Sequence, residues 1–350
     1  MRSESLNILA WQRLKRNKLS FFALYYIVIA VFIALFAVVI SPDSSPNANS
    51  MYIELAVQKP FTKVLFLEIP KNEKIEGHFL ESIFIGTPLK VKRVPIDSFK
   101  VLDNGIEYLP YNSAIKQIYI GEYKIFEQTF WAGTDKYGRD LLSRILYGMR
   151  ISLSVGFIAV LISLIIGISL GLVAGYFRGR MDDIIMWFVN VIWSIPTLLM
   201  VIAITLALGK GFWQVFLAVG LTMWVEVARI VRGQVLIIRE LEFVEAGKAL
   251  AYKPYRIIFK HILPNVIGPL IVISAANFAA AILIESGLSF LGIGAQPPLP
   301  SWGGIIKDHY AYIIMDKAYL AIIPGLAIMS LVLAFMVLGN GLRDAFDVKD

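Results

Sequence analysis

The chain has 350 residues, of which 57% are hydrophobic and 17% are charged, and it contains no cysteine. Soluble globular proteins average about 45–50% apolar residues, so this composition and a mean hydropathy of +0.69 predict a polytopic membrane protein. Without cysteine there is neither a disulfide framework nor a thiolate metal or nucleophile site. The net charge is +7, and the basic residues lie mainly in short segments beside apolar runs. This placement is typical of the loops that orient membrane helices in a lipid bilayer and does not indicate nucleic-acid binding.

The chain begins with a basic segment that continues into an apolar run. Basic side chains such as Arg2 and Arg13 precede residues 21–40, an uncharged stretch of the roughly 20 residues that a bilayer requires. A signal peptide has the same order of parts, but its apolar region is shorter and residues 38–42 offer no small-residue cleavage site. We therefore predict that residues 1–41 form a cytoplasmic N-terminus and a retained membrane helix.

Residues 42–130 are polar and charged, and we predict a soluble insertion outside the membrane. Three stretches rich in β-branched and aromatic residues predict a small β-rich domain, and they cover residues 63–69, 89–96 and 115–125. The sequence Asp-Asn-Gly at 103–105 marks a turn between them. We interpret the insertion as decoration on the outer face, over the alternative of a lip that helps to seat a partner protein.

A short polar motif, Gly-Thr-Asp-Lys-Tyr-Gly-Arg-Asp, follows the insertion at residues 133–140. Its two glycines and short polar side chains predict a turn in which Asp140 or a neighbour caps the next helix. We expect residues 141–152 to form an amphipathic helix along the outer surface. The six positions that define the motif are Gly133, Thr134, Asp135, Gly138, Arg139 and Asp140.

Residues 131–350 are predicted to contain five further membrane spans. They cover residues 151–176, 184–208, 212–228, 264–283 and 318–341. Glycines such as Gly167 and Gly171 in the first of them predict close helix packing, and Pro196 predicts a bend near residues 194–197. The basic residues between spans concentrate on the side of the N-terminus, as the positive-inside rule requires.

The polar segment 242–265 separates two apolar runs. Its charged side chains would each cost several kcal/mol, roughly, at a bilayer centre, so the segment lies in water or against another protein. Pro254 suits the first turn of a helix and biases Lys253 away from helical angles. We predict a short helix to about Leu250, a turn, and a second helix from Pro254, which serve as a docking device or as a solvated connector.

A few polar residues lie in or beside the predicted spans, and such residues are functional candidates by default. We place Asn190, Asn277 and Glu285 as candidates for a translocation path. Glu226 lies three residues before Arg229, which predicts an ion pair on one helix. We expect Glu285 near the outer boundary, within reach of water. For Asn277 and Glu285 a structural role is an equal alternative.

An enzymatic role finds no support in the motifs. The three histidines, His78, His261 and His309, are far apart and none belongs to a metalloprotease motif. No phosphate-binding Gly-x-x-x-x-Gly-Lys-Ser/Thr loop occurs, so we expect the chain to bind no ATP itself. Ser286 near a helix end resembles the nucleophile of an intramembrane protease, but no predicted span supplies a histidine base. A passive channel would show rings of charge or a filter sequence, and the spans show little of either.

The segment 242–265 resembles the EAA loop of ABC importer permeases. That loop has Glu-Ala-Ala, three residues, Gly, nine residues, and Ile-x-Leu-Pro, and four positions match it in register: Glu245, Ala246, Leu263 and Pro264. Three positions depart from it, because Gly247 replaces the second Ala, Ala251 replaces the turn Gly, and His261 replaces the Ile. If the turn requires a positive φ, alanine costs about 1 kcal/mol there. The turn is therefore either built differently or strained.

Two other stretches resemble the branch of this family that imports peptides and nickel. Residues 133–153 are similar to the GTD-x-x-GRD stretch of the C-type permease in dipeptide and oligopeptide importers, and residues 288–303 carry the family's LSFLG, QPP and SWG sequences. The resemblance covers about residues 131–347. It implies an all-α polytopic protein with the six membrane helices of the type I ABC importer permease fold, to which the β-rich insertion is added.

The resemblance also implies a function and partners. The chain would be a multi-pass permease subunit in a bacterial cytoplasmic membrane, with both termini in the cytoplasm, and would import short peptides or, less favoured, nickel chelates. Its partners would be a homologous permease, two cytoplasmic ABC ATPases that bind ATP and Mg²⁺, and an extracytoplasmic substrate-binding protein. An export or sensor assembly on the same fold is the alternative, beside a passive channel.

Within the coupling loop, at about residues 239–264, the resemblance assigns roles to single residues. Glu245, Ala246, Gly247 and Leu250 would contact the ATPase. Pro264 would fix the loop to the fifth span, so that a push on the loop is transmitted to the membrane helices.

Overall fold

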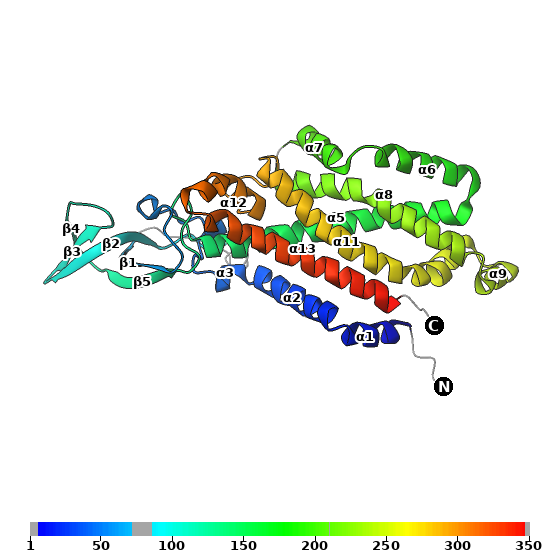
Figure 1. Ribbon diagram of the computed structural model, residues 1–350, viewed down its shortest axis with the longest axis horizontal. Helices are drawn as coiled ribbons and strands as arrows, with labels where there is room; N and C mark the ends of the chain where they lie inside the picture. Colours follow the sequence, from blue (N-terminus) through cyan, green and yellow to red (C-terminus); the bar gives the residue numbers. More distant parts are fainter. Residues whose placement is uncertain (1–5, 72–85, 210, 347–350) are drawn as a thin grey trace. The chain divides into compact units, whose positions relative to one another are not determined.

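The computed structural model describes residues 6–71, 86–209 and 211–346, and it is mostly helical with one small β-sheet (Figure 1). The chain divides into two compact units. The helical unit comprises residues 1–30, 152–295 and 328–350, and the sheet unit comprises residues 31–151 and 296–327. The sheet unit thus contains the predicted insertion together with the sequence on either side of it. His78 lies outside the described residues.

Helices account for most of the chain. In order they are α1 (Leu6–Arg16), α2 (Lys18–Leu35), α3 (Ala37–Ile40), α5 (Leu141–Phe177), α6 (Gly179–Trp193), α7 (Thr197–Leu208), α8 (Phe212–Ile238), α9 (Glu242–Ala249), α10 (Pro254–Ile257), α11 (Leu263–Phe290), α12 (Trp302–His309) and α13 (Tyr319–Phe346). Shorter turns are η1 (Pro46–Ala48), η2 (Ile53–Leu55), the π-helical η3 (Ile258–Ile262) and η4 (Tyr310–Met315). Within the described ranges, five helices are long and apolar enough to cross a membrane, and α6 with α7 makes a sixth span if the pair counts as one. The predicted fold class is confirmed.

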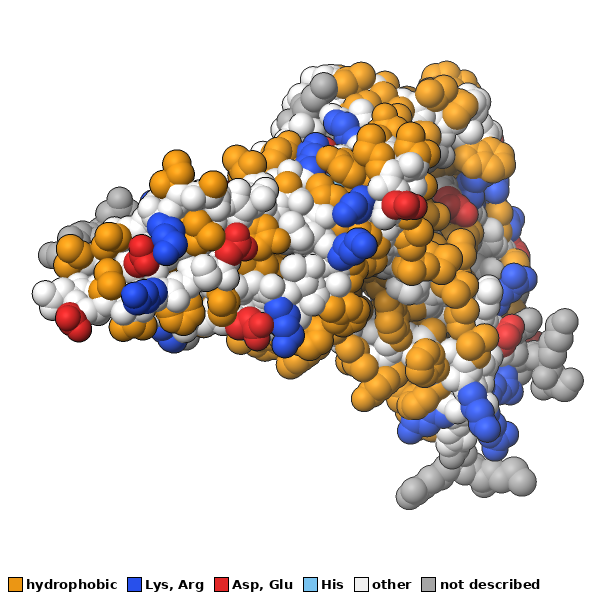
Figure 2. Space-filling view, turned by 60° about the vertical axis from the view of Figure 1, so that its left-hand side comes forward, with side chains coloured by type: hydrophobic (Ala, Val, Ile, Leu, Met, Phe, Trp, Pro, Cys, Tyr) orange, Lys and Arg blue, Asp and Glu red, His pale blue; other side chains and the backbone are white. Residues whose placement is uncertain are grey.

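The apolar spans leave many large side chains uncovered. On α2, for example, Leu19 and Phe22 are each 66% exposed. The space-filling view shows hydrophobic side chains over much of the visible face (Figure 2). An apolar surface of this extent is expected where lipid tails are the solvent.

One expectation about the helix after the polar motif is wrong. Residues 141–152 form no separate surface helix, because α5 continues without a break from Leu141 to Phe177. Helix α5 contains no proline, and the glycines within it are tolerated in a helix. The predicted cap is confirmed, since the Ser143 amide donates to Asp140 Oδ2 at 2.8 Å and so closes the first turn of α5.

The predicted bend in the third span is confirmed. Helix α6 ends at Trp193 and α7 begins at Thr197, and their axes differ by 90°. Pro196 stands directly before α7, where its missing amide proton breaks the hydrogen-bond ladder. The Ser194 amide still donates to the Asn190 carbonyl at 3.0 Å, so α6 is closed before the break.

Glycines let α5 approach α8 closely. A Cβ atom added at Gly167 would lie 2.6 Å from the Cβ of Val227, and one at Gly171 would lie 2.7 Å from the Cβ of Val231. The same relation repeats one turn on, between Gly175 and Val235 at 2.7 Å. Because residues four apart share a helix face, a row of glycines on α5 meets a row of valines on α8.

The sheet unit contains a five-stranded antiparallel sheet in the order β4-β3-β2-β1-β5. Its strands are β1 (Thr62–Pro70), β2 (Val91–Leu102), β3 (Gly105–Pro110), β4 (Gln117–Ile120) and β5 (Lys124–Phe130). Leu102 pairs with Gly105, so the predicted turn at residues 103–105 is a two-residue hairpin loop. Phe66 and Phe130 are almost fully buried in a small core beneath β1 and β5.

We predict that Gly171→Ala lowers the free energy of unfolding by about 1–3 kcal/mol, because overpacking a close helix contact forces the backbones apart. The new Cβ would lie 2.7 Å from the carbonyl oxygen of Ala228. Thermal unfolding of the purified chain in detergent measures the loss. Gly233→Ala on α8 is the control, because nothing lies within 4 Å of its added Cβ. Equal shifts in both variants would show that the glycine row is not a tight contact.

Candidate functional site

The polar segment between α8 and α11 folds as the predicted helix-turn-helix. Helix α9 ends at Ala249, and α10 begins at Pro254, which occupies a first-turn position. Lys253 precedes it with an extended ψ of 146°, as the restriction before proline requires. We call this segment, residues 242–262, the docking loop.

The turn of the docking loop is a Schellman motif closed on alanine. The Tyr252 amide donates to the Gly247 carbonyl at 3.1 Å, and the Ala251 amide donates to the Lys248 carbonyl at 2.9 Å. Ala251 has φ +56°, a left-handed conformation that glycine adopts without cost and alanine does not. Of the two alternatives drawn from the sequence, the strained turn is the one that the structure has.

An aromatic ring holds this turn against the next helix. The Arg256 guanidinium lies 4.0 Å from the centroid of the Tyr252 ring. The His261 ring is stacked with Tyr252 at 6.1 Å between centroids. His261, which departs from the family pattern, therefore packs within the loop.

The docking loop shares one hydrophobic core with the membrane helices. Its buried side chains join a cluster with α8 and α11, and the members nearest the loop are Val235, Ile238, Val244, Ile257, Ile258, Ile262 and Val266. The π-helical turn η3 runs directly into α11 at Leu263, so α10 and α11 are continuous. Single π turns inside helices are frequent at functional sites. The loop cannot shift without moving the ends of both helices.

The outward face of α9 is exposed among the described residues. Glu245 and Ala246 are exposed, and Leu250 is 65% exposed. Gly247 is buried and faces Tyr252 instead, so it does not belong to the surface that we expected to meet a partner. Of the four residues expected to meet a partner, three are exposed: Glu245, Ala246 and Leu250.

Glu285 is the centre of a buried polar cluster on α11. It is 1% exposed, so the expectation that water reaches it is wrong. The Ser289 hydroxyl donates to Oε1 at 2.7 Å, and the hydroxyls of Ser152 and Ser286 donate to Oε2 at 3.4 and 3.5 Å. Ser289 Oγ also accepts the Ala295 amide at 3.1 Å, which ties the cluster to the turn that follows α11.

The three candidates for a translocation path do not meet. Asn277 is 2% exposed on α11, and its Nδ2 has no hydrogen-bond partner among the described residues. It stands eight residues before Glu285, which is about 12 Å along a helix axis. Asn190 lies exposed on α6, where its Oδ1 accepts from Arg229 Nη2 at 3.4 Å.

The predicted ion pair between Glu226 and Arg229 is wrong. The Arg229 guanidinium lies 3.8 Å from the ring centroid of Trp193 and donates to Asn190. Neighbours from α6 thus replace the carboxylate one turn away on α8, because the stacked geometry satisfies the planar cation.

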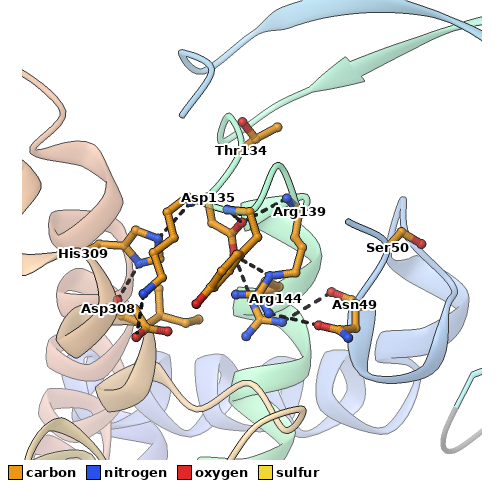
Figure 3. Close-up of polar contacts among 12 residues, drawn as sticks. Asn49, Ser50, Thr134, Asp135, Arg139, Arg144, Asp308 and His309 are labelled. Atoms are coloured by element: carbon orange, nitrogen blue, oxygen red, sulfur yellow. Dashed lines mark hydrogen bonds and ion pairs between the residues drawn. The ribbon is translucent and has the colours of Figure 1, made fainter. Parts of the chain in front are cut away.

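In the sheet unit, the polar motif at 133–140 is built around Asp135, whose side chain is fully buried (Figure 3). Its Oδ2 accepts from Arg139 Nε at 2.6 Å and pairs with Arg144 Nε at 3.6 Å. Its Oδ1 accepts the amides of Tyr137 and Arg139 at 2.8 and 3.0 Å. Arg139 reaches on to Asn49 Oδ1 at 3.0 Å. Every oxygen of this buried charge is satisfied, as burial requires.

The other motif residues hold the segment that precedes the sheet. Gly133 and Gly138 have φ of +78° and +72°, and a Cβ at Gly138 would overlap the carbonyl oxygen of Tyr52. Thr134 Oγ1 accepts the Gln58 amide at 2.8 Å. The motif therefore has a structural role: it holds residues 52–58 against the start of α5. This role accounts for its glycines and its short polar residues.

Helix α12 packs against the motif at residues 133–140, a contact that sequence reasoning missed. Lys136 Nζ pairs with Asp308 at 3.1 Å, and the Lys136 amide donates to His309 Nε2 at 3.2 Å (Figure 3). Because His309 Nε2 accepts this amide, the ring proton lies on Nδ1 and the ring is neutral. Nδ1 donates that proton to the Ile305 carbonyl at 2.7 Å. Burial lowers the pKa of His309 and keeps this form. Only the meeting of α12 with the motif turn reveals these partners.

Trp302 fixes the same junction. It is fully buried, its Nε1 donates to the Ile145 carbonyl at 2.9 Å, and its ring lies over Gly148 of α5. A Cβ at Gly148 would come within 2.6 Å of the indole, so only glycine admits the ring here.

Comparisons with protein families match two parts of the chain. Residues 167–349 match the family of the binding-protein-dependent transport system inner membrane component. Residues 5–57 match the N-terminal TM domain of oligopeptide transport permease C. The similarity therefore begins well before residue 131, where the motifs had placed its start.

Relatives with assigned names cover most of the chain. It is 41% identical over 219 residues to the glutathione transport system permease protein GsiD of Pectobacterium atrosepticum, covering 63% of this chain and 72% of that protein. It is 45% identical to the dipeptide transport system permease protein DppC of Bacillus subtilis, covering 63% and 68%. The DppC of Lactococcus lactis is 31% identical over 340 residues, covering 97% of this chain and 90% of that protein. Among solved structures, an inward-facing MetNI methionine ABC transporter aligns with 60% of this chain and 98% of its own at 17% identity and a TM-score of 0.49.

Ala251→Gly is expected to stabilise the docking loop by roughly 0.5–1 kcal/mol, because glycine adopts the left-handed conformation without strain. Amide hydrogen exchange measures this as slower exchange in α9. Ala249→Gly, two residues earlier in the helix, is the control and should speed exchange, since glycine weakens a helix. Faster exchange in both variants would mean that Ala251 is not strained.

Proposed function

We propose that this chain carries short peptides across the cytoplasmic membrane of a bacterium. The chain belongs to the family of binding-protein-dependent transport system inner membrane components. It is a permease subunit of an ABC importer, and alternating access driven by separate ATPase subunits moves the cargo. The observation that carries the proposal is the docking loop, which exposes one face and is continuous with α11.

The cargo class rests on the relatives. Their names assign them glutathione, dipeptides and oligopeptides, all of which are peptides. We therefore place short peptides before nickel chelates. The scarcity of charge in the spans suits a wide and weakly selective path, and preference among peptides would lie with the substrate-binding protein.

The docking loop supports a mechanical route. A cytoplasmic ATPase would grip Glu245, Ala246 and Leu250, and closure of the ATPase pair would displace α9. Since Val244 and Ile257 belong to the core of α8 and α11, the displacement would turn these helices and switch access between the two sides. ATP and Mg²⁺ would be held by the ATPases and not by this chain.

The arrangement of the helical unit supports the proposed orientation. Helix α1, the docking loop and the last turn of α13 lie at one end of this unit (Figure 1). Basic residues gather there, with Arg13, Lys15 and Arg16 in the last turn of α1. The positive-inside rule assigns that end to the cytoplasm. A second, homologous permease and a substrate-binding protein on the outer face would complete the importer.

Purification of the tagged chain from its own host in mild detergent tests this function. We expect a second permease and ATPase subunits to co-purify. Recovery of the chain alone, while a known membrane complex of the same host stays intact, would overturn the docking interpretation.

We predict that Glu245→Lys reduces peptide uptake per ATP hydrolysed, or releases the ATPases, because it reverses charge on the proposed contact face. Uptake and ATP hydrolysis are measured together in proteoliposomes that hold the reconstituted complex. Lys260→Glu is the control and should leave coupling unchanged, because it reverses an exposed charge of the docking loop outside α9. Wild-type coupling in Glu245→Lys would remove Glu245 from the contact.

A further inference from the structure

A small cavity in the sheet unit has no part in the proposed transport mechanism. Its volume is about 10 Å³, which is room for one water-sized occupant. Its lining residues come from the segment before the sheet, from strands β2 and β5, and from the cap of α5. They are Asp43, Ser50, Tyr52, Arg93, Gln128, Phe130 and Asp140.

Asp140 brings an unsatisfied charge to this cavity. Its side chain is 3% exposed, and its Oδ2 accepts from the amide and hydroxyl of Ser143. Its Oδ1 is buried and has no hydrogen-bond partner among the described residues. Burying a carboxylate oxygen without a hydrogen-bond donor costs free energy, so a bound donor or cation beside this atom would stabilise the structure.

Asp43 brings a second carboxylate to the same cavity. It is 4% exposed, its Oδ1 accepts from the Ser45 amide at 2.9 Å and the Ser50 hydroxyl at 3.0 Å, and its Oδ2 accepts from the Ser50 amide at 3.0 Å. All these donors are neutral. The Asp43 amide also donates to Ser143 Oγ at 3.0 Å, so one serine joins the Asp43 backbone to the Asp140 carboxylate.

The nearby cations are paired elsewhere. Arg93 Nε pairs with Glu68 at 2.8 Å, and Arg139 and Arg144 pair with Asp135. Within the described ranges no salt bridge reaches Asp43 or Asp140. Around the cavity there are four carboxylates and three guanidinium groups, so one negative charge is left uncompensated. The carboxylates are Asp43, Glu68, Asp135 and Asp140, and the guanidinium groups are Arg93, Arg139 and Arg144. Burial makes such a charge expensive.

We propose that this cavity binds one alkali metal cation between Asp43 and Asp140. The available donors are all hard oxygens, from the two carboxylates, the hydroxyls of Ser50 and Tyr52 and the amide of Gln128, and such oxygens suit alkali and alkaline-earth ions. A single positive charge balances the single excess negative charge. Arg93 on the wall disfavours a divalent ion. In the described part of the chain no group of three or more His, Cys, Asp or Glu side chains is arranged to hold a metal ion, which speaks against a transition metal.

A bound cation would join the sheet to α5. Asp43 belongs to the segment that leaves the first span, Gln128 belongs to β5, and Asp140 caps α5. The ion would thereby stabilise the sheet unit.

Thermal unfolding of the full-length chain at pH 8 tests the proposal, with choline chloride replaced stepwise by NaCl at constant ionic strength. We expect a saturable rise of the midpoint by about 2–4 °C. Asp140→Asn should abolish the sodium response while it keeps the helix cap, because asparagine caps as well as aspartate. Asp103→Asn, in an exposed turn of the same sheet, should respond like the natural chain.

Two results would overturn the site. One is a full sodium response in Asp140→Asn. The other is a midpoint that is indifferent to sodium and rises only on acidification, which would mean that a proton neutralises the carboxylates. Both readouts are independent of ATPase partners and of peptide uptake.

Discussion

The structure depends on one constraint at the docking loop: its buried side chains belong to the same core as the membrane helices. Val244 of α9 and Ile257 of α10 pack with Val235 of α8 and Val266 of α11. Burying each such side chain contributes about 1.5–3 kcal/mol. A loop anchored this way moves together with its helices, whereas a solvated connector would absorb a push.

The same core extends along α8 to its contact with α5. Gly171 of α5 admits Val231 of α8, which belongs to the cluster that also holds Val244. Because interiors are close-packed, a displacement at one end is passed on as a shift of whole helices. The strained Schellman turn at Ala251 holds α9 against Tyr252. The turn thereby fixes the orientation of the outward face of α9.

Buried charge is handled differently in the two units. In the sheet unit, Asp135 is surrounded by two guanidinium groups and two amides, so replacing both arginines would leave its buried charge uncompensated at a cost of about 3–5 kcal/mol. In the helical unit, the donors to Glu285 among the described residues are neutral hydroxyls. The first arrangement fixes a rigid junction, and the second places an ionisable group inside the helix bundle without a cation.

The sequence by itself determined what local chemistry controls. Apolar runs predicted the spans, Pro196 predicted the bend, Pro254 predicted the start of α10, and Asp140 predicted the cap, because each signal acts within a few residues of its effect. The three motif stretches at residues 133–153, 242–265 and 288–303 were together sufficient to indicate the family. These features follow from helix periodicity, missing amide protons and capping oxygens, which neighbours far along the chain do not alter.

Only the tertiary structure decided which residues meet. It buried Gly247 and Glu285, turned Arg229 from Glu226 to Trp193, and joined α12 to the Asp135 motif, from which it lies more than 160 residues away in sequence. It also placed Asp43 beside Asp140 around one cavity. Burial and pairing depend on distant segments that arrive at the same point, and no local pattern records that arrival.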